Sequence, residues 1–285
     1  MDHAKRGSQS KEDLMLDELE GCAARLATRC GEGELVWHRW GSGPALVLLH
    51  GGTGSWRHWV RTIPHFAASR TVLAADMPGL GESAMAPGPA EPASVAAALA
   101  ASLAELLGPE RLYDLAGFSF GANIGTHLAA LEGGHVRSHT IVGAASLGFP
   151  RPPVDLQKIR DKQGAQRAAT HRQNLNALML IDPARIDDEA IRIQDWTTVH
   201  ARLRSRGFAS GTSLKDRLAH VAAPMRAIWG ERDQVSWPHI PERLAMLHAA
   251  RPELLSAVIP GAGHWVMYEA PEAFNAALAR MLNGV

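Results

Sequence analysis

The run LAGFSFGA at residues 115–122 decides the fold that we predict for this chain. A short apolar stretch, residues 112–116, leads into the pattern Gly-x-Ser-x-Gly, and residues 122–131 after it favour a helix. A serine between such a strand and helix lies in a strained turn, and the glycines two positions away let both elements approach without a Cβ clash. The pattern therefore predicts that the hydroxyl group of Ser119 stands out beyond the end of a strand.

Continuous apolar runs recur along the chain and alternate with helical patterns. Besides residues 112–116, runs typical of strands buried on both faces lie at 45–49, 71–75, 140–144, 226–229 and 255–259. A further strand is predicted at 34–40, and helices are predicted at 93–107, 122–131, 240–249 and 271–282. This alternation predicts an α/β fold with a mostly parallel central sheet and helices on both faces.

The alternation stops between residues 147 and 213. That segment contains helical patterns at 174–180 and 187–196 and no convincing strand. We interpret residues 147–213 as a helical cap that is inserted into a core formed by residues 31–146 and 214–285.

The N-terminal residues, 1–30, are interpreted as an extension of this core. Residues 1–10 are polar and are expected to be disordered, whereas residues 11–30 have helical spacing and are expected to lie as a helix on the body of the protein. No stretch resembles a signal peptide or a membrane span, so we expect a cytoplasmic protein.

The charge balance limits the partners that we expect. Lys plus Arg and Asp plus Glu both number 29, so the formal net charge is zero and gives no reason to expect nucleic acid or an anionic membrane as a partner. A small-molecule substrate fits better, and homo-oligomerisation is left open. Cys22 and Cys30 lack the spacing of a metal site and indicate free thiols.

Candidate partners for Ser119 follow the ends of other predicted strands, which is where ligands gather in an open α/β sheet. A glycine-rich turn at 50–56 follows one strand, Asp233 follows a second and His264 follows a third. A serine hydroxyl needs an imidazole to take its proton, and the imidazole needs a carboxylate to fix its tautomer. Ser119, Asp233 and His264 match these roles in this chain order. Glu231 is the alternative carboxylate.

Five motifs in this order resemble the α/β-hydrolase superfamily over residues 35–282. They are HGG at 50–52, DMPGLGES at 76–83, GFSFG at 117–121, WGERD at 229–233 and GHW at 263–265. The resemblance implies that the backbone N–H groups of Gly52 and Phe120 form an oxyanion hole. It implies no metal ion and no organic cofactor, and a serine rather than an aspartate at position 119 argues against dehalogenase and epoxide-hydrolase chemistry.

Three aromatic residues are candidates for the substrate pocket. Phe118 precedes the serine, Trp265 follows the candidate base, and Trp196 lies in the predicted cap. The other two residues that end or follow strands near this site, His50 and Asp76, are interpreted as structural residues that brace their own turns.

The resemblance leaves the reaction open. The HGG and GHW motifs are also similar to the carbon–carbon hydrolases that cleave ring-fission products of aromatic degradation. Those enzymes usually have asparagine at the position of Phe118, and their cap arginine has no clear counterpart here except Arg192 or Arg172. We therefore expect a hydrolase of small, largely apolar carboxylic esters, with carbon–carbon hydrolysis as the alternative. A cofactor-free perhydrolase and a non-catalytic ligand receptor are further alternatives.

Overall fold

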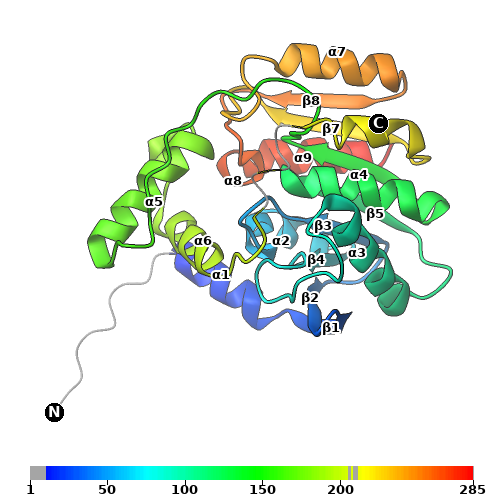
Figure 1. Cartoon of the computed structure of the whole chain (residues 1–285), viewed down its shortest axis with the longest axis horizontal. Helices are drawn as coiled ribbons and strands as arrows, with labels where there is room; N and C mark the ends of the chain where they lie inside the picture. Colours follow the sequence, from blue (N-terminus) through cyan, green and yellow to red (C-terminus); the bar gives the residue numbers. More distant parts are fainter. Residues whose placement is uncertain (1–10, 205–206, 208–210, 285) are drawn as a thin grey trace.

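The computed structural model describes residues 11–204, 207 and 211–284 (Figure 1). The disorder expected for residues 1–10 lies outside the described residues. The strands are β1 (Ala24–Cys30), β2 (Gly33–Trp40), β3 (Ala45–Leu49), β4 (Thr71–Ala75), β5 (Tyr113–Phe118), β6 (Val136–Val142), β7 (Met225–Gly230) and β8 (Leu255–Ile259).

All eight strands form one sheet in the order β1-β2-β4-β3-β5-β6-β7-β8. β1 pairs with β2 and β2 pairs with β4 in antiparallel fashion, and the remaining neighbours are parallel. The carboxyl ends of β3, β5, β6, β7 and β8 therefore meet at one edge of the sheet. The predicted α/β class with a mostly parallel sheet is confirmed.

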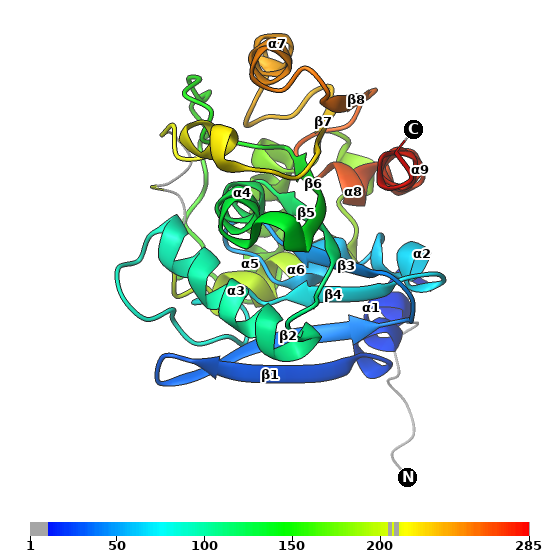
Figure 2. The same cartoon turned by 90° about the vertical axis from the view of Figure 1, so that its right-hand side faces the viewer.

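Helices cover both faces of this sheet, as Figure 2 shows for α3 and α4 on one side and α2, α8 and α9 on the other. The α-helices are α1 (Lys11–Gly21), α2 (Ile63–Ala67), α3 (Pro92–Leu107), α4 (Phe120–Glu132), α5 (Gly164–Leu178), α6 (Asp188–Val199), α7 (Ile240–Ala250), α8 (Val266–Glu269) and α9 (Pro271–Leu282). The short 3-10 helices are η1 (Trp56–Trp59), η2 (Gly133–His135), η3 (Pro183–Arg185) and η5 (Lys215–His220).

Burial of the strands follows their position in the sheet. In the central strand β3, Val47 and Leu49 pack on the side of α3 and α4, and Leu46 and Leu48 pack on the opposite side. The prediction of burial on both faces was wrong for β8, where Val258 is 39% exposed. Side chains of a strand point alternately to the two faces of the sheet, and Ser256 and Val258 share the face that is open to solvent at this outer strand.

The single helix expected over residues 11–30 was wrong in its second half, because α1 ends at Gly21 and the chain then enters β1. β1 and β2 form a hairpin in which Cys30 pairs with Gly33 and Gly31 has a φ of +55°. Alternate side chains of β1 face the protein, and the Thr28 hydroxyl lies 2.5 Å from that of Ser102 on α3. In residues 24–30, pairing with the sheet gives side chains that alternate between the two faces, although the sequence spacing also favours a helix.

Residues 147–213, between β6 and β7, carry α5, η3 and α6, and α5 and α6 lie to the left of the sheet in Figure 1. The two ends of this segment are hydrogen-bonded to one another at a place that we call the neck. The N–H of Leu214 donates to the carbonyl oxygen of Ser146 at 3.2 Å, and the N–H of Gly148 donates to that of Gly211 at 3.2 Å. The helices predicted in this segment are present and are longer than predicted, and its treatment as a separate cap remains our interpretation.

Candidate active site

Ser119 lies in the strained turn that the sequence predicts. Its φ and ψ are 53° and −111°, between the end of β5 and the start of α4. A Cβ atom on Gly117 would lie 2.2 Å from the carbonyl oxygen of Gly121, and one on Gly121 would lie 2.4 Å from that of Leu49. Both positions therefore require glycine, and the close approach fixes the serine at the carboxyl edge of the sheet.

The three residues predicted as catalytic are brought together. His264 Nε2 lies 3.0 Å from Ser119 Oγ, and His264 Nδ1 lies 2.8 Å from Asp233 Oδ2. Since a carboxylate can only accept, His264 carries its proton on Nδ1, and Nε2 accepts the hydrogen bond from the serine hydroxyl. This arrangement leaves the imidazole ready to take the serine proton.

Asp233 is completely buried and is held as an acceptor by its own turn. Its Oδ1 accepts the N–H groups of Val235 at 2.8 Å and Ser236 at 3.1 Å. These bonds fix the carboxylate group and leave Oδ2 for His264. The alternative acid, Glu231, instead accepts the N–H of Gly261 and is exposed, so it does not contact His264.

The glycine-rich turn after β3 is held between two buried histidines. His50 Nε2 accepts the N–H of Met77 at 2.9 Å, which places the ring proton on Nδ1, and Nδ1 donates to the carbonyl oxygen of Gly51 at 2.7 Å. His58 Nδ1 accepts the N–H of Gly51 at 3.2 Å. These bonds fix the peptide plane that carries the Gly52 N–H, which has no hydrogen-bond partner among the described residues. Burial lowers the pKa of His50 to about 4 and keeps the ring neutral at neutral pH.

Several residues that support this site were missed by the sequence analysis. Glu269 accepts the N–H of Gly263 through Oε2 at 2.6 Å, and its Oε1 accepts the N–H groups of Ile181 and Asp182 at 2.7 Å. Gln234 Oε1 accepts the N–H of His264 at 3.0 Å. Glu269 thereby joins the loop of the candidate base to the segment between α5 and η3. Its only signal in the sequence is its position five residues after His264.

Asp76 is structural, as predicted. Its two oxygens accept the N–H groups of Trp56 and Glu82, each at 2.9 Å. Burial raises the pKa of this carboxyl to about 6, although these hydrogen bonds oppose the increase. Asp76 therefore joins the turn after β4 to the start of η1 and does not contact His264.

A cavity of about 1090 Å³ opens in front of Ser119 and His264. Apolar side chains from the core and from the segment between β6 and β7 form much of its wall, namely Phe118, Phe120, Val154, Leu156, Ile159, Leu178, Met179 and Val235. Gly52 also borders the cavity, so the predicted oxyanion residues and the predicted catalytic serine face one space.

Phe118 lines this cavity as predicted, but Trp265 and Trp196 do not. Trp265 is completely buried, donates from Nε1 to the carbonyl oxygen of His58 at 2.9 Å and stacks on Tyr268. Because His264 points toward Ser119, the next side chain in the loop turns away into the core. Its role is therefore packing, which corrects the prediction.

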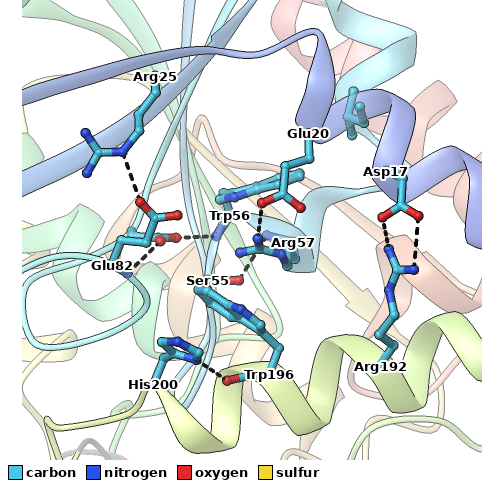
Figure 3. A network of polar contacts seen from close by, with 12 residues as sticks. Asp17, Glu20, Arg25, Ser55, Trp56, Arg57, Glu82, Arg192, Trp196 and His200 are labelled. Atoms are coloured by element: carbon cyan, nitrogen blue, oxygen red, sulfur yellow. Dashed lines mark hydrogen bonds and ion pairs between the residues drawn. The ribbon is translucent and has the colours of Figure 1, made fainter.

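Trp196 lies on the far side of α6, where the guanidinium of Arg57 is 3.8 Å from its ring centre (Figure 3). The residues two positions before and after it, Gln194 and Thr198, line the cavity instead. Residues four apart share one face of a helix, and the residue midway between them faces the other way. The prediction for Trp196 fails for this reason.

The two cap arginines considered as carboxylate ligands are also engaged elsewhere. Arg192 pairs with Asp17 of α1 at 2.5 Å (Figure 3), and Arg172 donates to the carbonyl oxygen of Ile186. Neither lines the cavity. Among the described residues, the cations that do line it are Arg151, Lys158 and Arg160, from the stretch before α5.

Within the described part of the chain, no three His, Cys, Asp or Glu side chains are placed to share a metal ion. Over the same residues, no helix combines the length and the apolar character that a membrane span requires. Cys22 and Cys30 are both free thiols.

A mostly parallel sheet that presents a hydrogen-bonded serine, histidine and aspartate at its carboxyl edge defines an α/β protein of the hydrolase type. The chain belongs to the alpha/beta hydrolase family, whose family model matches residues 46–277.

Characterised relatives span several activities. The chain is 30% identical over 276 residues to the dihydrolipoyllysine-residue acetyltransferase component of an acetoin cleaving system from Pseudomonas putida, a match that covers 91% of this chain and 69% of that protein. It is 29% identical to the pimeloyl-[acyl-carrier protein] methyl ester esterase of Edwardsiella ictaluri, over 88% of this chain and 98% of that protein. It is 26% identical to a 2-hydroxy-6-oxononadienedioate/2-hydroxy-6-oxononatrienedioate hydrolase of Comamonas testosteroni, over 82% and 86%.

Solved structures share the fold. A crystal structure described as a putative lipase from Acinetobacter baumannii aligns over 99% of this chain and 98% of that chain, with a TM-score of 0.79 and 19% identity. At this identity the likeness concerns the fold alone.

Proposed function

We propose that the protein is a serine hydrolase that cleaves small, largely apolar carboxylic esters through an acyl-enzyme intermediate. The observation that carries this proposal is the chain of two hydrogen bonds from Asp233 through His264 to Ser119, at 2.8 Å and 3.0 Å. A serine activated in this way at the wall of a cavity is suited to attack a carbonyl carbon.

In the first half of the reaction, Ser119 Oγ bonds to the ester carbonyl carbon while its proton passes to His264 Nε2. The carbonyl oxygen becomes an oxyanion that accepts the N–H groups of Gly52 and Phe120. Each such donor contributes on the order of 10²- to 10³-fold in rate. His264 then gives the proton to the leaving alcohol oxygen as the carbon–oxygen bond breaks, and the acyl group remains on Ser119.

In the second half, His264 Nε2 takes a proton from water, and the resulting hydroxide oxygen attacks the acyl carbon. The carbonyl is restored, the bond to Ser119 Oγ breaks, and His264 returns the proton to the serine. Asp233 stays ionised throughout and stabilises the imidazolium.

The cavity wall supports an apolar substrate. Its part nearest to the serine includes Phe118, Phe120 and Val235, and Leu178 and Met179 extend it toward α5. The esterase among the relatives adds support for ester chemistry in this family.

Carbon–carbon bond hydrolysis is the second candidate. It is favoured by the relatives with that activity and by the side chains of Lys158 and Arg160, which line the cavity and form no ion pair among the described residues. These cations could hold the carboxylate of a vinylogous diketo acid. Against it stands Phe118, whose ring contacts His264 at 4.9 Å between centres and leaves no amide at that position.

The test is hydrolysis of short p-nitrophenyl esters together with labelling by a fluorophosphonate. The wild-type protein should turn over the esters and be labelled on Ser119, and Ser119→Ala should lose both activities, with at least a 10³-fold lower kcat. Ser213→Ala is the matched control, since its hydroxyl contacts His127 and lies outside the cavity wall. Absence of both turnover and labelling would defeat the proposal in favour of a ligand receptor, and faster cleavage of a diketo acid than of any ester would favour the second candidate.

A further inference from the structure

A second carboxylate–imidazole pair lies in the segment between β6 and β7. His171 on α5 places Nε2 2.8 Å from Oδ1 of Asp195 on α6. The same oxygen accepts a hydrogen bond from Nε of Arg167, one turn before His171 on α5. Arg167 also donates to the carbonyl oxygen of Ile159 at 3.2 Å, so it ties the pair to the stretch that lines the cavity before α5.

The other ring nitrogen of His171, Nδ1, is not the atom bonded to Asp195 and belongs to a residue of the cavity wall. The side chain is 2% exposed, and the residue belongs to the cavity wall. Within the described part of the chain, Nδ1 has no hydrogen-bond partner. The unpaired ring nitrogens of His58 and His139 are sealed from solvent, whereas Nδ1 of His171 is not among the sealed atoms.

The proton position on this ring follows from its neighbour. A carboxylate only accepts, so His171 must donate from Nε2 to Asp195, and Nδ1 is left with a lone pair. Burial has the largest effect on the pKa of His171 and lowers it. The contact with Asp195 raises the pKa and the charge of Arg167 lowers it, and the net result is a pKa below the ordinary value of histidine. The ring is therefore neutral at neutral pH, and Nδ1 is an acceptor on a residue that lines the cavity.

We propose that His171 Nδ1 is a recognition subsite that selects substrates carrying a hydroxyl group remote from the scissile ester bond. The proposal rests on the proposed function and names its substrate class, a hydroxylated ester. In a largely apolar cavity, a single buried acceptor has a large effect on the selectivity between substrates. A substrate without a donor displaces the water from that acceptor and leaves it without a hydrogen bond.

The surroundings of His171 fit a hydroxyl better than a charged group. Gln194 and Thr198 on α6 line the same wall, and Thr198 Oγ1 is committed to the carbonyl oxygen of Gln194 at 2.7 Å. A neutral hydroxyl can donate to His171 and accept from the side-chain amide of Gln194. Lys158 and Arg160 line the same cavity, but an anion placed at His171 itself would face the lone pair of Nδ1.

The first test is independent of activity. Two-bond ¹⁵N–¹H spectra of the full chain distinguish a protonated ring nitrogen from an unprotonated one, and His171→Asn identifies the signals of His171. At pH 7.5 we expect a neutral ring with the proton on Nε2. A protonated Nδ1, in either the other tautomer or the imidazolium, would overturn the proposal even if no ester is cleaved.

The second test compares matched esters within each protein. The substrates are p-nitrophenyl ω-hydroxyalkanoates, ω-methoxyalkanoates and unsubstituted alkanoates with acyl chains of four to ten carbons. Butanoate monoesters of alkanediols and of alkanols probe the alcohol side. In the wild-type protein, kcat/KM for one hydroxylated length should exceed that of its unsubstituted and methoxy counterparts about five- to tenfold. Equal values in both series would overturn the proposal.

Variants separate a loss of recognition from a general loss of activity, because we compare the ratio of kcat/KM between matched esters within each variant. His171→Leu should abolish the preference for the hydroxylated ester, and His171→Asn should restore part of it, since its amide can present an acceptor. His127→Leu is the matched control, as His127 is a partly buried histidine outside the cavity wall, and it should keep the wild-type ratio. A wild-type ratio in His171→Leu would contradict the proposal.

Asp195→Asn gives the sharpest readout. The asparagine amide can donate to Nε2, which moves the ring proton to Nδ1 and makes it a donor. The methoxy ester should then gain relative to the hydroxylated ester, because both ether and hydroxyl oxygens accept. A loss shared equally by all three esters would indicate a structural role only. Failure to turn over any ester, with the expected tautomer intact, would count against the proposed function and not against the subsite.

Discussion

Among the described residues, two carboxylate–imidazole pairs have their histidine in the wall of one cavity, and they differ in what lies beyond the imidazole. At the end of the sheet, Asp233 is fully buried and the far nitrogen of His264 meets a serine hydroxyl. On α5 and α6, Asp195 is 43% exposed and the far nitrogen of His171 meets no side chain among the described residues. Under our two proposals, the same pair of side chains supplies a base where a nucleophile is in reach and an acceptor where it is not.

The two pairs also differ in the structural elements that carry them. His264 and Asp233 stand on loops that leave adjacent parallel strands, and their turns are fixed by backbone N–H groups. His171 and Asp195 stand on two helices that pack together beside the sheet, and a single arginine braces them.

The largest expected effect separates the two carboxylates. Asp233→Asn should lower kcat for a short unsubstituted ester roughly 10³- to 10⁴-fold, because His264 would lose the partner that fixes its tautomer. The loss in Asp195→Asn should be at least 100-fold smaller. Steady-state kinetics of the two variants, with circular dichroism to verify folding, make the comparison. Losses of similar size would mean that His171 and Asp195 take part in the chemistry.

A second prediction concerns the buried histidines of the core. Burial lowers the pKa of His38 to about 4, so the folded state resists a proton that the unfolded chain binds below about pH 6.5. Above that pH, this difference does not lower the free energy of unfolding. As the pH falls toward 4, the free energy of unfolding decreases by about 3 kcal/mol in total. His38→Phe, which keeps an aromatic ring in contact with both Trp40 and Trp56, should reduce the pH dependence of unfolding by about one proton.

Urea denaturation at several pH values measures this slope. His171→Leu should remove less of it, since the contact with Asp195 offsets part of the effect of burial on the pKa of His171. An unchanged slope in His38→Phe would show that His38 is protonated in the folded protein.

The smallest expected effect concerns the link between core and cap. Glu20 of α1 pairs with Arg57 at 2.5 Å, and that guanidinium is 5% exposed and stacked on Trp196 (Figure 3). Glu20→Gln should lower the free energy of unfolding by about 1 kcal/mol, because a buried cation loses its ion pair while solvent still reaches the half-exposed Glu20 position. Asp17→Asn, which breaks the exposed pair with Arg192, should cost less than about 0.5 kcal/mol. Equal costs would show that burial of Arg57 does not matter.

Local patterns predicted the strands best where a largely apolar run is bounded by turn residues. β3, β4 and β8 begin and end at the predicted residues, although β4 starts with Thr71 and β8 contains Ser256. β6 begins at Val136 and not at residue 140, since Arg137 and Ser138 look like loop residues in the sequence. Both are satisfied by Asp114 on the neighbouring strand, a partner that no local pattern reveals.

The residues of the candidate site also differ in how well local sequence patterns predict them. Ser119, Asp233 and His264 could be found because each follows a strand, and the topology brings such positions together. His171 and Asp195 are 24 residues apart on two helices, and their meeting depends on how those helices pack. Trp196 was misplaced for the same reason, since the sequence gives the period of α6 but not which face turns to the cavity.

The neck at Ser146 and Leu214 has a consequence for the exchange of residues 147–213. The two ends of the segment are hydrogen-bonded to one another beside β6 and β7, so we expect that a change in the length of the intervening residues leaves the register of these strands intact. A replacement segment would need to bring its own partners for Arg57, Asp17 and Glu269. We expect that such an exchange would change the cavity wall while it keeps the hydrogen bonds between Asp233, His264 and Ser119.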